Sequence, residues 1–195
     1  MDKVKIEAFL SKRDSRVTTI EIANKLYQAV GTENLRSKIH HPTLDNFELG
    51  CVMNYFAFTQ KTLVDFIFMN FIAVIGSYQT KSNTLKAWAK IPFSNEVEKN
   101  TVMLQLKEIR ARYADARNNF ICHINDDMQN CSSSVLTQQI NDDVMILRNN
   151  LNIIRRANNL PIVITTYSPS DHYPVIGLDK LISIVSDGTS ILSVA

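Results

Sequence analysis

The sequence predicts an all-α fold, an up-and-down bundle of about five helices followed by a short mixed C-terminal extension. Glycine and proline, which most often interrupt helices, number only five each in 195 residues. No glycine falls between Ser77 and Ile176, and no proline between Phe93 and Leu160. Apolar residues in that region recur at spacings of three and four, which place them on one face of a helix. Two long helices are therefore expected there.

The first long helix is expected to begin after Ser94 or Asn95, either of which can cap its first turn, and to run to about Asn130. Glu96 and Glu98 add negative charge near its N-terminus, where the helix dipole favours it. Its apolar face consists of Val102, Leu106, Ile109, Tyr113, Ala116, Phe120 and Ile124.

The second long helix follows a turn at residues 131–134 and is expected to end near Asn158. Arginines in its later turns and Pro161 just beyond them are typical of a helix C-terminus. Its apolar face consists of Ile140, Val144, Leu147, Leu151 and Ile154.

Two helices are expected near the N-terminus. A short one covers residues 3–12. Thr18 and Glu21 have the spacing of a capping box, which indicates the start of a second helix, and Gly31 indicates its end.

A more apolar helix is expected between a capping pair, Asp45 and Glu48, and Gly76. It is long enough to cross a membrane, but polar residues recur throughout it: Asn54, Gln60, Lys61, Asp65 and Asn70. We interpret it as a buried helix of a protein without a membrane partner. In the following connection, residues 77–94, the single tryptophan Trp88 is expected to pack on the bundle.

These elements give two parts, a helical bundle at residues 1–158 and a C-terminal extension at residues 159–195. The extension contains three of the five prolines, a β-branched run at residues 162–167 that suits a short strand, and a possible helical turn at residues 179–185. We expect it to pack on the bundle or to lie at a dimer interface.

Composition excludes several classes of function. The glycines are isolated, so no Gly-x-Gly loop exists for a nucleotide phosphate. A net charge of +2 leaves no global attraction to nucleic acid. The odd number of cysteines, without Cys-x-x-Cys spacing, and the absence of an apolar leader favour a cytoplasmic protein. His40 and His41 lack companion ligands, so neither a metal nor a cofactor is expected.

The candidate chemistry lies at residues 117–123, RNNFICH, in the second half of the first long helix. Arg117 is a permanent cation suited to a phosphate, Asn118 offers donors and an acceptor, and His123 exchanges protons near neutral pH. Together these side chains suit cleavage of a phosphodiester without a metal ion. Arg110, one heptad before Arg117, is a weaker candidate for RNA binding.

This stretch resembles the motif of the HEPN superfamily, an arginine followed by a polar residue and, four to six residues further on, a histidine. Phe120 and Ile121 followed by a small residue before His123 resemble the abortive-infection branch. The resemblance implies a dimeric, metal-independent endoribonuclease of a toxin or phage-defence system, with RNA as substrate and an antitoxin protein as a further candidate partner. It assigns the catalytic roles to Arg117, Asn118 and His123. Control by adenylylation would need a tyrosine at Asn125, so that mode is not expected.

Helical geometry adds a constraint on this motif. At about 100° per residue, Arg117 and His123 border the apolar face on opposite sides, roughly 9 Å apart along the axis. A site that uses both therefore needs a helix irregularity or a two-fold pairing of motifs, and we favour the dimer.

Two simpler interpretations remain open: His123 as a hydrogen-bonded interface histidine, and Arg117 paired with a carboxylate of another helix. The alternative function is then a catalytically silent helical protein that binds a partner or regulates a defence operon. Glu108 and Arg112, spaced i, i+4, are expected to form an ordinary surface pair.

Overall fold

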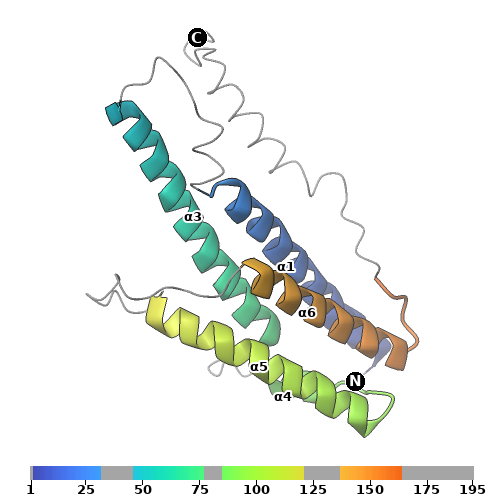
Figure 1. Ribbon diagram of the computed structural model, residues 1–195. Coiled ribbons are helices and arrows are strands. Elements are labelled where there is room, and N and C mark those ends of the chain that lie inside the picture. The colour runs from blue at the N-terminus through green and yellow to red at the C-terminus, as the bar shows by residue number, and fades with distance from the viewer. Residues whose placement is uncertain (1, 32–45, 77–84, 121–136, 164–195) are drawn as a thin grey trace. The chain divides into compact units, whose positions relative to one another are not determined.

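The computed structural model describes residues 2–31, 46–76, 85–120 and 137–163, without the side chains of residues 46–49, 115–120 and 137. Every secondary-structure element in these residues is a helix (Figure 1), so the predicted all-α fold is confirmed. The helices are α1 (Lys3–Ala29), α3 (Asn46–Ile75), α4 (Leu85–Ala89), α5 (Glu96–Phe120) and α6 (Thr137–Ala157).

The chain forms two compact units, which are described separately. The first unit comprises residues 1–21 and 65–165, and the second comprises residues 22–64 and 166–195. The boundary predicted between residues 158 and 159 stays a prediction, because residues 164–195 lie outside the described part of the chain.

Helix α1 is continuous from Lys3 to Ala29, so the prediction of two helices at this end was wrong. No glycine or proline interrupts the run, and its buried residues keep the helical spacing throughout. They are Ile6, Leu10, Arg13, Val17, Ile20, Ala23 and Asn24. Thr18 and Glu21 consequently lie in the middle of α1 and cap nothing; their side chains serve another purpose described below.

Helix α3 ends where the sequence predicted. Gly76 has a φ of 110°, a left-handed conformation that glycine adopts without strain, and its amide donates to the carbonyl of Ile72 at 2.8 Å. Asp45, half of the predicted capping pair, lies outside the described residues.

Burial along α3 is one-sided. One side of its second half is buried: Ile67, Phe68, Asn70, Phe71, Ile72, Val74 and Ile75. By length and composition, Gly50–Ile75 is apolar enough to cross a membrane, but the core helices of soluble proteins pass the same test. Of its most apolar 18-residue stretch, 39% is buried. The interpretation as a buried helix thus holds for one side of α3.

Trp88 packs in the core of the first unit, as predicted. It lies on the short helix α4, is fully buried, and meets the ring of Phe9 edge to face at 5.4 Å. Its indole Nε1 donates to the carbonyl of Val74 at 3.3 Å, so the one polar atom of the ring is satisfied.

The predicted ends of the long helices agree with the structure wherever they are described. The Asn95 side chain accepts from the amide of Glu98 at 2.8 Å and so caps α5. Helix α6 ends at Ala157, and Asn159 adopts the left-handed conformation common after a helix, with a φ of 51°. The predicted end of α5 near Asn130 and the turn at residues 131–134 lie outside the described residues.

Helices α5 and α6 lie side by side and run in opposite directions (Figure 1). Near the start of α5, the carbonyl of Pro92 accepts from Asn158, just beyond the end of α6, at 3.0 Å. Further along, Arg112 of α5 meets Asp143 in the second turn of α6. The expected apolar faces are buried wherever their side chains are described: Val102, Leu106, Ile109 and Tyr113 on α5, and Ile140, Val144, Leu147, Leu151 and Ile154 on α6. The side chains of Ala116, Phe120 and Ile124, also expected on the α5 face, lie outside the described part of the structure.

The chain beyond α6 turns back along this helix. The amide of Asn152 pairs with the backbone of Val163 in both directions, donating at 3.1 Å and accepting at 3.2 Å. Leu160 is buried at the turn. The first residues of the predicted extension therefore lie against the bundle.

In the second unit, the last turns of α1 and the first half of α3 supply the described residues. Ala23, Asn24, Val30 and Phe56 are buried here. A Cβ on Gly31 would lie 3.7 Å from the side chain of Gln60, so the two helices are close at this point. Gly31 follows the end of α1 by two residues, as predicted.

Two leucines on α5 provide a matched test of this packing. Leu106 is fully buried, whereas Leu104 is 58% exposed. We expect Leu106→Ala to lower the free energy of unfolding by about 2–5 kcal/mol. Leu104→Ala, the same chemical change, should alter it by less than about 0.5 kcal/mol. Urea unfolding followed by circular dichroism measures both, and equal effects would contradict the burial pattern.

Candidate functional site

The predicted motif begins in the last turn of α5. Arg117 and Asn118 lie within this helix, as the sequence indicated, but their side chains lie outside the described part of the structure. His123 lies in residues 121–136, also outside it. The helix that carries the motif is thus placed, whereas the convergence of the three side chains stays a prediction.

An ion pair one turn before the motif fixes α5 against α6. Arg112 donates from Nε to Asp143 Oδ2 at 3.2 Å and from Nη2 to Oδ1 at 2.7 Å. Gln139 donates to the same carboxylate at 3.2 Å. Arg112 was expected to pair with Glu108 at the surface, and this prediction was wrong about its main partner. The guanidinium instead binds Asp143, because its two parallel N–H groups match the two oxygens of that buried carboxylate. These hydrogen bonds raise the pKa of Arg112.

Tyr113 completes this cluster from the buried side of α5. Its hydroxyl donates to Asp143 Oδ2 at 3.0 Å, so the fully buried carboxylate has three partner side chains. Its ring stacks on Phe71 at 3.8 Å and meets Phe68 edge to face at 5.4 Å. Burial raises the pKa of the Tyr113 hydroxyl, and the neighbouring Asp143 carboxylate raises it further. The phenol is therefore held neutral.

Arg110, the weaker RNA-binding candidate, lies on the buried side of α5 with 9% of its surface exposed. A phosphate contact by this side chain stays a prediction, and nothing in the geometry adds to it.

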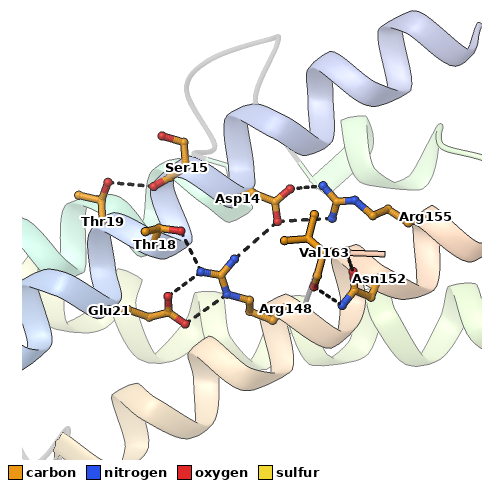
Figure 2. A network of polar contacts seen from close by, with 9 residues as sticks. All are labelled: Asp14, Ser15, Thr18, Thr19, Glu21, Arg148, Asn152, Arg155 and Val163. Carbon is orange, nitrogen blue, oxygen red and sulfur yellow. Dashed lines mark hydrogen bonds and ion pairs between the residues drawn. The ribbon is translucent and has the colours of Figure 1, made fainter. Parts of the chain in front are cut away.

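A second polar network joins α6 to α1 (Figure 2). From α6, Arg148 donates to both carboxylate oxygens of Glu21, at 3.2 and 2.5 Å, and to the hydroxyl of Thr18 at 2.9 Å. Its Nη1 lies 3.8 Å from Asp14. Arg155, seven residues further along α6, forms a bidentate pair with Asp14. Thr18 and Glu21, expected as a helix cap, thus bind an arginine of another helix.

This second network is largely shielded from solvent and balanced in charge. The side chains of Arg148 and Arg155 are 9% and 8% exposed, and those of Asp14 and Glu21 are 15% and 11% exposed. Two cations face two anions at hydrogen-bonding distance, so no net charge remains for a phosphate. We interpret the network as a structural link between α1 and α6.

Arg13, also on α1, lies over aromatic rings. Its guanidinium carbon is 3.3 Å from the ring centre of Phe9 and 5.2 Å from that of Trp88, and its Nη1 donates to the carbonyl of Phe9. Burial lowers the pKa of Arg13, and nearby Arg16 lowers it further. Cation–π contact is the evident compensation for this desolvation.

No group of three or more His, Cys, Asp or Glu side chains is arranged to hold a metal ion within residues 2–31, 46–76, 85–120 and 137–163. Cys51, on α3, is a free and exposed thiol.

Comparison with known proteins gives no relative from which a function follows. No protein-family model matches the chain, and the searches of curated proteins and of solved structures return no match.

Removal of Arg148 tests the structural interpretation of the second network. Arg148→Met should lower the free energy of unfolding by about 3–5 kcal/mol, because it leaves Glu21 buried without its main partner. Arg156→Met on the exposed side of α6 is the matched control and should cost less than about 1 kcal/mol. Urea unfolding measures both; similar losses would show that the network contributes no more than a surface arginine.

Tyr113 should make stability depend on pH in the alkaline range. An unfolded tyrosine releases its proton near pH 10, whereas folded Tyr113 retains it, since its pKa is raised. The contribution of Tyr113 to the free energy of unfolding is thus complete below about pH 10. Above that pH it falls by up to about 1.4 kcal/mol per pH unit. Tyr113→Phe should remove this part of the slope. The midpoints of urea unfolding of the parental protein and of Tyr113→Phe, from about pH 8 to 11, measure this difference in slope. The same pH dependence in both proteins would contradict the role given to Tyr113.

Proposed function

We propose that this protein is a HEPN-like, metal-independent endoribonuclease of a toxin or phage-defence system. The observation that supports the proposal is the RNNFICH sequence, whose first residues, Arg117 and Asn118, lie in a long helix of an all-α bundle. In this proposal Arg117, Asn118 and His123 form the catalytic site. No family match supports it, so it depends on the motif and on the fold around it.

The proposed reaction is a transesterification within the RNA backbone. A neutral His123 takes the proton of a ribose 2′-hydroxyl, and the 2′-oxygen attacks the adjacent phosphorus. The bond from phosphorus to the 5′-oxygen breaks, and the departing oxygen takes a proton from a protonated histidine. Arg117 stabilises the charge that develops on the phosphate, and Asn118 orients it by hydrogen bonding. The products are a 2′,3′-cyclic phosphate and a 5′-hydroxyl.

This reaction needs one histidine as base and another as acid at the same time. Each chain supplies one motif histidine, and the helical repeat expected from the sequence sets Arg117 and His123 on opposite borders of one apolar face. A homodimer that brings two motifs together satisfies both needs. An antitoxin protein that covers the site is a further proposed partner.

Three of the described arginines already bind carboxylates, so they are poor candidates for the phosphate ligand. Arg112 is held by Asp143, and Arg148 and Arg155 are held by Glu21 and Asp14. A phosphate at any of these three would have to displace a carboxylate that already fits the guanidinium.

A catalytically silent protein that binds a partner is the second candidate. The observation that favours it is the exposed aromatic surface of α3, where Tyr55 and Phe58 are 64% and 71% exposed. Apolar surface of this kind marks protein contacts more often than catalysis.

Incubation with total RNA tests the proposal. The parental protein should cleave RNA equally with and without a chelator and leave cyclic phosphate ends. Arg117→Ala and His123→Ala should each lower the rate by about 10²–10⁴-fold, with unchanged circular dichroism. Arg156→Ala and His172→Ala are the controls matched by residue type and should cleave at the parental rate. Cleavage by His123→Ala at the parental rate would sink the ribonuclease proposal, and absence of any cleavage would favour the silent protein.

A further inference from the structure

One side of α3 carries a row of side chains that faces away from its buried residues. We name this row the α3 stripe. It consists of Cys51, Tyr55, Phe58, Thr62, Phe66, Met69 and Ala73. Helix α3 is continuous over these positions, so their relation follows from the helical repeat alone. At about 100° per residue, all seven fall within about 40° of Thr62, and the fully buried Phe71 lies directly opposite.

The large members of the stripe are exposed to solvent. The exposed fractions are 64% for Tyr55, 71% for Phe58, 46% for Phe66 and 48% for Met69. With roughly 200 Å² for a whole aromatic side chain, the three aromatic residues leave roughly 360 Å² in water. That is within the range of the largest apolar patch on a monomer, which commonly has a binding role.

The one polar side chain near the middle of the stripe is satisfied internally. The Thr62 hydroxyl donates to the carbonyl of Phe58 at 3.0 Å within α3 itself. Its methyl group is therefore free to make apolar contact, and no polar atom at the centre of the stripe needs water.

The order of side-chain sizes along the stripe is the same in both directions. Small residues lie at its two ends, Cys51 and Ala73, and at its centre, Thr62, so that eleven positions separate each from the next. Two large residues lie in each of the two intervals. A two-fold contact between antiparallel helices brings residues at equal distances on either side of its axis to the same height. This order therefore sets large residues beside large ones and small residues at the centre and the ends. We propose that the α3 stripe is the contact surface for a second copy of this chain, with the two α3 helices antiparallel and crossing at Thr62.

The helical geometry of this arrangement places large side chains beside one another without collision. A two-fold axis at Thr62 brings Phe58 of one copy to the height of Phe66 of the other. Phe58 lies about 40° to one side of the midline and Phe66 about 40° to the other, so the rings pack side by side. Tyr55 and Met69 pair in the same way. Only Thr62 meets itself, and its small side chain allows close approach of the two helices.

A membrane surface is the competing occupant, and the charge of the helix argues against it. Helices that lie on membranes carry many lysines and arginines on their polar side. Helix α3 has a single lysine, Lys61, and no arginine. A second copy suits this helix better than anionic lipid does. The proposal does not rest on the ribonuclease function, because its readout is the oligomeric state.

Sedimentation velocity of the full chain from about 1 to 100 μM tests the proposal. The parental protein should form a dimer that dissociates on dilution, as expected for a contact below standard interface size. Phe58→Lys and Phe66→Glu should each weaken it by at least about 30-fold. The two changes combined in one chain place opposite charges side by side across the axis and should restore part of the lost affinity. Leu104→Lys, at an exposed leucine of α5, is the control and should leave the dimer unchanged.

A cross-link tests the position of the axis. In a chain whose native cysteines are replaced by serine, Thr62→Cys should form a disulfide-linked dimer on mild oxidation, whereas Leu104→Cys should not. Circular dichroism shows whether each variant is folded; the altered side chains are exposed, so folding should be retained.

Three results would overturn the proposal. The first is a parental protein that is monomeric at every concentration tested. The second is a dimer whose affinity does not change on Phe58→Lys. The third is a monomer that floats with phosphatidylcholine–phosphatidylglycerol vesicles and loses this binding on Phe58→Lys. Cleavage of RNA by a dimer that is indifferent to Phe58→Lys would overturn the α3 contact and leave the ribonuclease proposal standing. An inactive dimer would do the reverse.

Discussion

The first unit depends on charges that lie within the apolar face of α6. Asp143, Arg148 and Arg155 alternate along this helix with fully buried Leu147, Leu151 and Ile154. A charge in such a position destabilises the fold unless it meets an opposite charge at hydrogen-bonding distance. Asp143 meets α5, and the two arginines meet α1. Apolar packing tolerates small shifts of one helix along another, whereas a bidentate ion pair does not. These pairs therefore set the register of α6 against both neighbours.

This register has a consequence for the proposed catalytic site. Arg112 and Tyr113 are bound to Asp143 only four to five residues before Arg117. The part of α5 that leads into the motif is thus held from the side of α6 by three hydrogen bonds and from the other side by the stacked ring of Phe71. A catalytic group must keep its position within a fraction of an ångström, and a helix held in this way is a suitable support. The same pairs bind Arg112, Arg148 and Arg155 to carboxylates, so these arginines are separate from the proposed catalytic residues.

The sequence predicted those features that local residues determine. The cap at Asn95, the ends of α3 and α6, and the buried faces of α5 and α6 each depend on residues within a few positions of one another. The prediction at Thr18 and Glu21 failed because their partner, Arg148, lies 127 residues away from Glu21, and the capping pattern carries no information about it. A signal for the network was nevertheless present: Asp143, Arg148 and Arg155 follow the spacing of the apolar face, where an unpaired charge would be costly. Whether Arg117 and His123 meet is likewise a question of tertiary structure, and their spacing along one helix does not answer it.

Helix α3 shows how one element can satisfy two different demands. Its buried side carries Phe68 and Phe71, which pack against Tyr113 and so support the Asp143 cluster. Its opposite side carries the α3 stripe, where the rings of Tyr55, Phe58 and Phe66 are exposed to water. Because the two sides are opposed on the helix, a substitution in the stripe should not disturb the core pairs, and loss of an ion pair should not alter the stripe. The oligomeric state and the internal stability can therefore be varied independently, which makes the dependence of any activity on dimer formation open to direct measurement.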